Sequence, residues 1–517
     1  MERGRLARGR PGRPRPIMSE KLDLAVIGAG PAGMAAATLA AELGLDTVLI
    51  DEQDAPGGQI YRGVERAPAG STLGDDYLAG KPLAAALRAS QAHYLPSTTV
   101  WHIDPDGTLS LISAGESRAI RARRVLLAMG AIERPVPIPG GTLPGVMTAG
   151  AAQIALKTAD LVPSGRTVLA GQGPLFWLIA AQLSRAGAPP ALMLETRPHA
   201  NLHAAAPLVA RALWPGRRAL AKGLGLIGEV KRTGVPILRR VTGLRAIGGA
   251  RLESVAWDGG EAPADLLLLH EGVIPNTQVS LGLQLDHRWD AAQLCWRPVT
   301  DEWGATRLSI IAIAGDGGGI AGAEAAVLSG RLAALDAAMW LGRLGEAERD
   351  RRAAPIRAAL DHERALRPFL DRLYRPPHSV LVPAEDEVIA CRCEEVSVGQ
   401  IRRALRRELA IRPFLDALYR PVPSVLVPPD DVIACRCEEV TVAQIRQAAR
   451  LGAQGPNQAK AFTRCGMGPC QGRICGPIVG AVMADTLGKT IAATGTYRPR
   501  APYKPITVGA LAGLAEG

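Results

Sequence analysis

The sequence predicts an α/β protein with two strand–turn–helix–strand units, followed by a small, mostly helical C-terminal domain. Glycine-rich turns follow apolar runs of strand length within 22–53 and again within 165–198, and they predict the two units. Seven of the eight cysteines lie between 391 and 475, which predicts a separate C-terminal domain. At 517 residues the chain has room for about three domains of roughly 150 residues each.

Composition and charge exclude several classes of protein. Hydrophobic residues make up 47% of the chain, enough for globular cores, and no apolar run reaches the roughly 18 residues of a membrane span. Residues 1–17 hold six Arg, one Glu and no apolar stretch, so they are interpreted as a disordered basic tail and not a secretory signal. Without them the formal charge falls from +11 to +6, and the remaining excess forms no nucleic-acid motif. We expect no nucleic-acid partner and a cytoplasmic location, with peripheral contact at the inner face of the plasma membrane left open.

The first glycine-rich turn has the spacing of a dinucleotide-binding site. It lies between an apolar strand at 22–27 and a helix of small residues at 32–43, and its G-x-G-x-x-G glycines are Gly28, Gly30 and Gly33. The first makes the tight turn, the second lets backbone approach a pyrophosphate, and the third lets the helix pack on the strand. Glu52 follows the second strand (47–51), where an acid binds the ribose hydroxyls of the adenosine half.

Three further segments resemble flavoproteins with two dinucleotide-binding domains, of the glutathione and thioredoxin reductase type. They are "PGGQIYRG" (56–63), "RRVLLAMGAIERP" (123–135) and "IIAIAGDGGGIAGAEAAVLSGRLAALDAA" (310–338). The resemblance implies FAD as the cofactor. It adds six cofactor-binding residues: Gly57, Gly58, Gln59, Gly130, Gly315 and Asp316. Asp316 would hold the ribityl or pyrophosphate region, and its alternative role is that of an ordinary helix N-cap.

The second glycine-rich turn departs from the pattern at one position. Gly171 and Gly173 are present, but Phe176 replaces the third glycine, where a large side chain should push the helix from the strand or redirect the turn. Glu195 ends the following strand. Three states stay open for this domain: it binds NAD(P), it holds another adenine nucleotide structurally, or it is empty.

Cysteine placement argues against dithiol chemistry in these two units. Neither 56–63 nor 155–290 contains a cysteine. Cys295 stands alone, and we expect it to be a small buried hydrophobe.

One segment of the chain occurs twice. "RPFLDRLYRPPHSVLVP" (367–383) recurs at 412–428 with 14 of 17 positions identical, and "VIACRCEEVSVGQIRRAL" (388–405) recurs at 432–449 with 14 of 18 identical. A solenoid would need several repeats to bury its faces. We therefore interpret the repeat as one segment copied once.

Only the second Cys-x-Cys, Cys435 and Cys437, is followed by further cysteines at domain-like distance: Cys465, Cys470 and Cys475. Four thiolates at such spacing fit a [2Fe–2S] cluster, and a four-cysteine structural zinc site is the alternative. From spacing alone, Cys465 with Cys470 is as good a second pair as Cys470 with Cys475. Cys391 and Cys393 have no second half of their own and are interpreted as a spare pair.

The C-terminal segment resembles the bacterioferritin-associated-ferredoxin type of [2Fe–2S] domain, in the form fused to flavoprotein dehydrogenases. The matching residues are "CRCEEVT" (435–441) and "TRCGMGPCQGRIC" (463–475). The resemblance implies that the ligands are Cys435, Cys437, Cys470 and Cys475. Cys465 falls where relatives often carry a residue that is not a ligand.

Together with the tail "TYRPRAPYKPITVGALAGL" (496–514), these motifs resemble the FAD-containing A (alpha) subunits of opine oxidases, hydrogen cyanide synthase and proline or hydroxyproline dehydrogenases. The resemblance implies an electron-transfer subunit in a hetero-oligomer, whose flavoprotein B (beta) subunit oxidises an amino acid, opine or related secondary amine. No motif supports a catalytic base at His102, His199 or His287, so the catalytic residue stays unknown. A stand-alone NAD(P)H-dependent reductase and a non-enzymatic scaffold that holds a cluster are the alternatives.

These observations divide the chain into six parts. The charged stretch 341–374 should be helical, with Pro355 breaking the helix. The predicted parts are a basic tail at 1–17, an FAD-binding domain at 18–150 and 290–345, an inserted NAD(P)-binding-like domain at 151–289, a helical linker with the duplicated segment at 346–430, a [2Fe–2S] domain at 431–490 and a C-terminal tail at 491–517.

Overall fold

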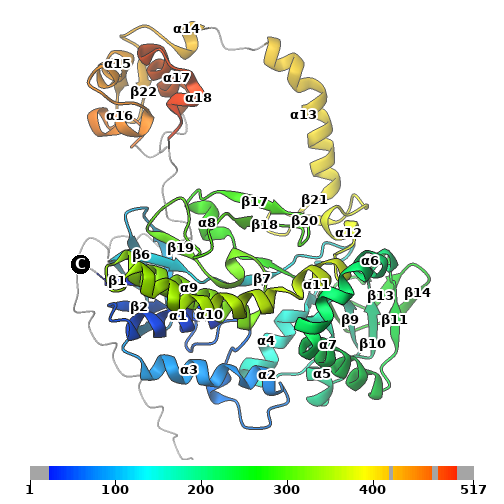
Figure 1. Ribbon diagram of the computed structural model, residues 1–517. Coiled ribbons are helices and arrows are strands. Elements are labelled where there is room, and N and C mark those ends of the chain that lie inside the picture. Colours follow the sequence, from blue (N-terminus) through cyan, green and yellow to red (C-terminus); the bar gives the residue numbers. More distant parts are fainter. Residues whose placement is uncertain (1–21, 419–422, 468–474, 498–517) are drawn as a thin grey trace, which may run out of the picture. The chain divides into compact units, whose positions relative to one another are not determined.

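The computed structural model describes residues 22–418, 423–467 and 475–497. The predicted basic tail, Cys470 and the end of the C-terminal tail lie outside these ranges. The described residues form two compact units that meet in sequence between Gln400 and Ile401, and the elements of both are labelled in Figure 1.

A seven-stranded sheet forms the base of the first unit. Its strands are β1 Leu22–Ile27, β2 Thr47–Ile50, β3 His93–Leu95, β4 Thr98–Ile103, β5 Thr108–Ser113, β6 Glu116–Leu127 and β19 Ile311–Ile313. The order is β3-β2-β1-β6-β5-β4, with β19 also paired to β6. β3, β2, β1, β6 and β19 are parallel, whereas β4 and β5 extend the sheet in antiparallel pairing. β1 and β2 are buried along their whole length, as expected for parallel strands covered on both faces.

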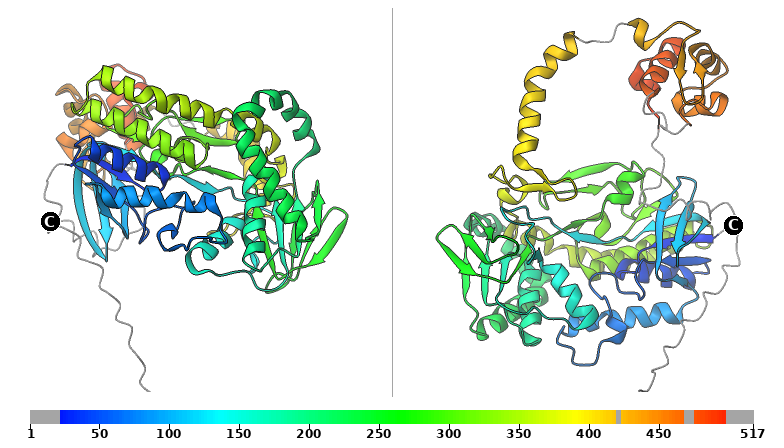
Figure 2. Two further views of the ribbon diagram at one scale, coloured as in Figure 1. Left: turned by 60° about the horizontal axis from the view of Figure 1, so that its bottom comes forward. Right: turned by 180° about the vertical axis from the view of Figure 1, so that it is seen from behind.

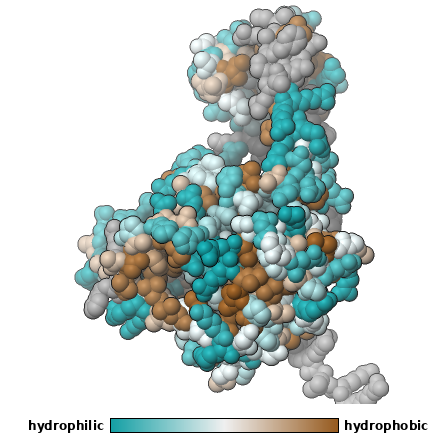
Figure 3. All heavy atoms as spheres, turned by 90° about the vertical axis from the view of Figure 1, so that its right-hand side faces the viewer, coloured by the Kyte–Doolittle hydropathy of each residue, from teal (hydrophilic) through white to brown (hydrophobic). Residues whose placement is uncertain are grey.

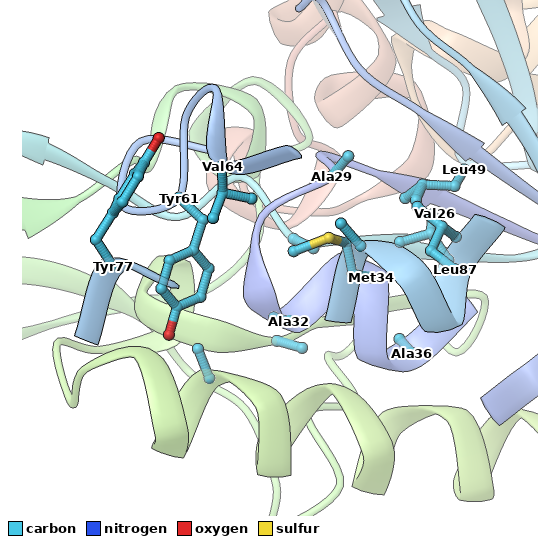
Figure 4. Close-up of a cluster of buried hydrophobic side chains, with 14 of the residues drawn as sticks. Val26, Ala29, Ala32, Met34, Ala36, Leu49, Tyr61, Val64, Tyr77 and Leu87 are labelled. Carbon is cyan, nitrogen blue, oxygen red and sulfur yellow. The ribbon is translucent and has the colours of Figure 1, made fainter. Parts of the chain in front are cut away.

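Small residues let the helices pack closely on this sheet. α1 (Pro31–Glu42), α9 (Ala323–Trp340) and α10 (Glu346–Arg364) lie side by side, and α3 (Gly80–Ala89) packs on α1 (Figures 1 and 2). A Cβ atom on Gly330 of α9 would lie 2.2 Å from the Ala32 carbonyl oxygen of α1. Figure 4 shows Ala32 facing that helix, with Val26, Met34 and Leu49 in the same buried cluster. The close approach explains how a chain with 4% aromatic residues fills its core.

A buried carboxylate joins three of these elements. Asp336 Oδ2 of α9 lies 3.0 Å from Arg124 Nη2 of β6, and its Oδ1 lies 3.6 Å from Arg349 Nη1 of α10. The predicted break at Pro355 was wrong, because α10 continues through it. Packing of the buried Ala353 and Leu360 in a cluster with α9 offsets the backbone hydrogen bond that proline lacks. None of the described helices combines the length and apolarity that crossing a membrane requires.

The inserted domain carries a second, wholly parallel sheet. Its strands are β8 Val146–Thr148, β9 Thr167–Gly171, β10 Leu192–Glu195, β11 Ile237–Arg239 and β15 Leu266–His270, in the order β11-β10-β9-β15-β8. Its helices are α4 Ala149–Ala159, α5 Pro174–Arg185, α6 His199–Ala205 and α7 Val209–Arg232. A small antiparallel sheet follows, with β12 Arg245–Ile247, β13 Ser254–Trp257 and β14 Gly260–Pro263. β7 (Ala131–Glu133) pairs with β16 (Val273–Pro275) where the chain crosses between the domains.

Phe176 is accommodated in the core of this inserted domain. Its side chain is fully buried and stacks edge-on against Trp177 at 5.4 Å between ring centroids. α5 still begins at Pro174, directly after Gly173. The predicted α/β class with two dinucleotide-binding-like domains is confirmed.

The remaining elements include both copies of the duplicated segment. The first copy forms α11 Arg367–Leu373, α12 His378–Leu381, β20 Ile389–Cys391 and β21 Val396–Ser397, and α13 (Val398–Leu418) crosses the sequence boundary. The second unit contains α14 Pro423–Leu426, β22 Ile433–Cys435, β23 Val440–Thr441, α15 Val442–Arg450, α16 Pro456–Thr463, α17 Gly476–Leu487 and α18 Ile491–Thr494. The two Cys-x-Cys segments fold into the same hairpin, since Cys391 pairs with Val396 as Cys435 pairs with Val440.

Candidate functional site

A cavity of about 500 Å³ lies at the carboxyl ends of β1, β2, β6 and β19. Parallel sheets bind ligands at this edge, where the helices that follow the strands present their N-termini. Of the ten residues predicted to bind the cofactor, eight line the cavity: Gly28, Gly30, Glu52, Gly58, Gln59, Gly130, Gly315 and Asp316.

Bare glycine backbone forms the floor of this cavity. A Cβ on Gly58 would lie 2.8 Å from the Gly30 Cα, so the two glycine motifs touch through their backbones. A Cβ on Gly33 would lie 1.8 Å from the Gly28 carbonyl oxygen, which explains why Gly33 packs behind the floor and does not line it. Gly57 also lies behind it, at φ +134°. Such a floor fits a dinucleotide pyrophosphate, which needs close backbone approach.

Asp51 is a cavity residue that the sequence analysis missed. β2 ends at Ile50, one residue earlier than predicted, so Asp51 is the first residue beyond the strand. Its carboxylate accepts hydrogen bonds from the backbone N–H groups of Ala29 (2.5 Å) and Gln53 (2.7 Å), and burial raises its pKa above the usual value. Asp51 and Glu52 both line the cavity, and Asp51 holds the glycine turn in place through the Ala29 N–H.

Asp316 faces the cavity and also braces the turn before α9, although the N-cap residue of α9 is Gly322. It lies in the short 3-10 helix η3 (Gly315–Gly318) and lines the cavity. Its Oδ1 accepts hydrogen bonds from the backbone N–H groups of Ala321 (2.9 Å) and Gly322 (3.1 Å). Asp316 therefore fixes the approach to α9 while it faces the cavity.

The inserted domain supplies another wall of the cavity, which the sequence did not predict. Its lining residues from α4 and α5 are Gln153, Lys157, Leu175, Leu178 and Gln182. Lys157 Nζ donates to the Gln59 carbonyl oxygen (3.1 Å) and to Gln153 Oε1 (2.9 Å). Gln153 Nε2 in turn donates to Gln182 Oε1 (2.7 Å). No glycine motif marks these positions, and only the packing of one domain on the other brings them to the cavity.

The second glycine-rich turn is covered by the chain itself. The Gln172 side-chain amide, at the centre of that turn, donates to the Arg375 carbonyl oxygen at 3.2 Å. Asn201 Nδ2 donates to the Arg375 (2.8 Å) and Leu373 (3.2 Å) carbonyl oxygens. Residues 373–375 therefore lie against the edge where a second dinucleotide would be held.

Charges at the second turn are neutralised within the domain. Glu195 is buried and lies 3.0 Å from Arg197 Nε and 3.5 Å from Arg239 Nε. The Tyr374 ring packs 5.8 Å from the Arg197 guanidinium. Glu195, which ends the second strand of this unit, is thus already paired, and its partner Arg197 is covered by an aromatic ring.

Three buried thiols come together in the second unit. The Sγ atoms of Cys435, Cys465 and Cys475 lie within 4.8 Å of one another, and Cys465 Sγ is 4.0 Å from Cys475 Sγ. Cys475 is the N-cap residue of α17, and a hydrogen bond from Cys465 lowers the pKa of Cys475 below its usual value. Of the other predicted ligands, Cys437 is exposed and Cys470 lies outside the described residues.

The first copy of the hairpin has a different setting. Cys391 is half-buried and Cys393 is exposed, and no group of three metal-binding side chains includes either of them within the part of the chain that the structure describes. Arg392 Nη2 donates to the Gly141 carbonyl oxygen at 2.7 Å, so this hairpin is held against another segment of the first unit.

Two further expectations concern isolated residues. Cys295 is buried, as predicted, and burial raises its pKa to about 11, which keeps the thiol protonated. None of the three histidines considered as bases, His102, His199 and His287, lines the cavity.

Comparison with known proteins agrees with this architecture. Residues 22–331, more than half of the chain, match the pyridine nucleotide-disulphide oxidoreductase family, and residues 434–514 match the sarcosine oxidase A3 domain. The chain is 40% identical over 520 residues to the A subunit of opine oxidase from Agrobacterium tumefaciens, covering 96% of this chain and 92% of that one. It is 30% identical over 513 residues to hydrogen cyanide synthase subunit HcnB of Pseudomonas aeruginosa, covering 95% and 98%.

Among solved structures, L-proline dehydrogenase from P. horikoshii has a similar fold, with a TM-score of 0.50, 19% identity, and coverage of 95% of this chain and 79% of that one. The expected family is confirmed at the level of the whole chain. The chain belongs to the family of the opine oxidase A subunits and hydrogen cyanide synthase subunit HcnB, and it is a flavin-dependent oxidoreductase.

Proposed function

We propose that this chain is the FAD- and [2Fe–2S]-containing electron-transfer subunit of a complex that oxidises an amino acid, an opine or a related secondary amine. The observation that carries the proposal is a glycine-floored cavity in the same chain as a buried group of three thiols. FAD accepts two electrons together and can release them singly, which matches a one-electron centre.

The cavity residues divide by the part of FAD that they would hold. Gly28, Gly30 and Gly58 would lie beneath the pyrophosphate, because their bare backbone allows close approach. Asp51 and Glu52 would face the ribose of the adenosine half. The predicted Gln59, Gly130, Gly315 and Asp316 line the rest of the cavity and complete this proposal, with Gly33 and Gly57 shaping its turns from behind.

The cluster would be held by Cys435, Cys437, Cys470 and Cys475. The burial of Cys435 and the place of Cys475 at the N-terminus of α17 support two of these ligands, because helix N-termini favour anionic thiolates. Cys465 lies beside both and competes with Cys475 for the fourth position. Structural zinc is the alternative for the same thiols.

The opine oxidase relatives are A subunits of larger enzymes, which supports a partner for this chain. We propose that the partner is a flavoprotein B subunit that carries the amine-oxidising site.

Figure 3 shows apolar patches among hydrophilic surface on one face of the molecule. Trp289 and Trp296 are exposed on the hairpin of β17 (His287–Asp290) and β18 (Cys295–Pro298) in the first unit. Their rings meet edge to face, with 5.7 Å between the ring centroids. Exposed aromatic pairs of this kind are typical of interfaces. A cytoplasmic location stays a sequence prediction, with peripheral membrane contact left open.

The stand-alone NAD(P)H reductase is the weaker candidate. A nicotinamide dinucleotide in the inserted domain would need the sheet edge that residues 373–375 cover. At that edge the Arg375 carbonyl oxygen already accepts hydrogen bonds from the side-chain amides of Gln172 and Asn201. We propose that this domain holds no dinucleotide and that electrons reach the flavin from the partner subunit.

Co-expression with a B subunit tests the function as a whole. We expect the complex to reduce an artificial acceptor in the presence of an amine chosen from opines, glycine, proline and hydroxyproline, whereas this chain alone should not. The measurement is acceptor bleaching with each subunit singly and together. Amine oxidation by the single chain at the rate of the complex would contradict the two-subunit proposal.

Gly58→Ala tests the cavity floor. The new Cβ meets the Gly30 Cα at 2.8 Å, and we expect FAD affinity to fall about tenfold or more, measured by flavin retained after gel filtration. Gly70→Ala is the matched control, because Gly70 has a similar positive φ (+76° against +60°) and nothing within 4 Å of the added atom. Equal flavin loss in both variants would mean that backbone strain, not the floor, is responsible.

The duplication provides its own control for the cluster. The wild-type chain should contain about two irons, and Cys435→Ser/Cys437→Ser should remove them together with the visible cluster spectrum. Cys391→Ser/Cys393→Ser should leave both unchanged. Zinc in place of iron would refute the [2Fe–2S] assignment, and iron loss in Cys465→Ala would make Cys465 a ligand.

Anaerobic addition of NADH or NADPH tests the covered second turn. Neither should bleach the flavin of the purified chain, whereas dithionite should do so fully. The measurement is flavin absorbance over time. Rapid bleaching of the flavin by either nucleotide would instead favour the alternative function, a stand-alone NAD(P)H-dependent reductase.

A further inference from the structure

Lys157 is a cation in the cavity wall without an acidic partner. It lies on α4 of the inserted domain, and its two hydrogen-bond acceptors, the Gln59 carbonyl and the Gln153 amide oxygen, are both neutral. No carboxylate among the described residues lies within 4 Å of its Nζ. Burial, with a smaller effect from Arg62, lowers the pKa of Lys157 to about 7. An ammonium desolvated in this way needs an anion to be stable.

Arg62 adds a second observation at the same wall. It also lines the cavity, and its buried Nε has no hydrogen-bond partner. The Tyr77 hydroxyl donates to the Arg62 carbonyl at 2.6 Å, and the Tyr77 ring lies 5.9 Å from Lys157 Nζ. Arg62 also interacts electrostatically with Asp51, whose pKa it lowers, whereas both hydrogen-bond acceptors of Lys157 are neutral. Lys157 is therefore the basic group of this wall that is arranged for a negatively charged ligand group.

The architecture indicates which part of FAD this wall meets. The pyrophosphate floor and the N-terminus of α9 belong wholly to the first domain, and the adenosine end points to Asp51, Glu52 and the nearby Thr98. Lys157 and Gln153 belong to the inserted domain and lie on the remaining wall, with Leu175 and Leu178 of α5. The flavin ring is the part of FAD left to face this wall.

We propose that Lys157 faces the flavin ring and stabilises the negative charge that the ring gains when it is reduced. Charge near the ring nitrogens is a main way in which a protein sets flavin reactivity. Lys157 acts as an electrostatic residue fixed by Gln59 and Gln153. The inference rests on the proposed FAD site and is independent of the cluster, the partner and the substrate.

Lys157→Gln is the test variant, since glutamine keeps a hydrogen-bond donor but has no charge. We expect the variant to retain FAD. The equilibrium constant for flavin reduction should fall about tenfold, which corresponds to a two-electron reduction potential about 30 mV lower than that of wild type. Lys157→Arg should restore most of the shift. Lys81→Gln is the matched control, because Lys81 Nζ also donates to a backbone carbonyl, that of Ala67, but does not line the cavity.

Sulfite provides a second readout that also works on the unaltered protein. It adds to oxidised flavin and leaves the ring anionic, so the wild-type protein should form the bleached adduct and Lys157→Gln should form it about tenfold more weakly, the factor expected for the potential. A wild-type chain that holds FAD but forms no adduct would overturn the inference, even if the variant does not fold.

The outcomes separate this inference from the proposed function. If the wild-type chain contains no FAD, the proposed function fails and the role of Lys157 falls with it. If FAD is present and the potential of Lys157→Gln equals that of wild type, only the role of Lys157 is refuted. Loss of FAD from Lys157→Gln with retention in Lys157→Arg would place the lysine on the phosphates and would also refute it.

Discussion

Contact between bare backbones at the glycine turns is the constraint on which the first unit depends. Gly33 packs on the Gly28 carbonyl and Gly58 packs on Gly30, at separations that leave no room for a side chain. These contacts bring the N-terminus of α1 to the ends of β1 and β2 and create the floor of the cavity. The Asp51 carboxylate holds the turn in place by accepting a hydrogen bond from the Ala29 N–H. Because the floor and the fold use the same glycines, loss of the ligand site and loss of local structure are closely coupled.

Much of this arrangement could be predicted from the sequence, because local motifs encode it. The glycine spacing, the strand–helix order and the Gly-Asp pair at Gly315–Asp316 all act within a few residues, and the structure brings them to one cavity. Asp51 was missed because the predicted strand was one residue too long. Lys157 and Gln153 could not be found in this way, since they reach the cavity only when the inserted domain packs on the first. The prediction that Pro355 breaks the helix failed for a related reason. Packing of α10 on α9 outweighs the local tendency of proline to end a helix.

The two copies of the duplicated segment contact different parts of the chain. Residues 373–375 of the first copy cover the second glycine turn through Gln172 and Asn201. Its Cys-x-Cys hairpin contacts the Gly141 carbonyl through Arg392 but has no third thiol among the described residues. In the second copy the same hairpin buries Cys435 beside Cys465 and Cys475. The described contacts of the first copy are thus to the flavoprotein domains, and those of the second are to the thiol centre, so the first copy is not wholly spare.

The covered turn and the cation-lined wall have one consequence in common. A flavin that exchanged hydride with a nicotinamide would need the inserted domain to hold that nucleotide. In this domain, however, Glu195 is already paired with two arginines, and the Gln172 side-chain amide donates to the Arg375 carbonyl oxygen. The same domain nevertheless lines the cavity proposed to hold FAD with Lys157, Gln153 and two leucines. In the proposed FAD site, the inserted domain would shape and charge the surroundings of the flavin. A dinucleotide-binding-like fold thus forms part of the wall of a neighbouring cavity, and this arrangement is consistent with our proposal that the flavin receives its electrons from another subunit.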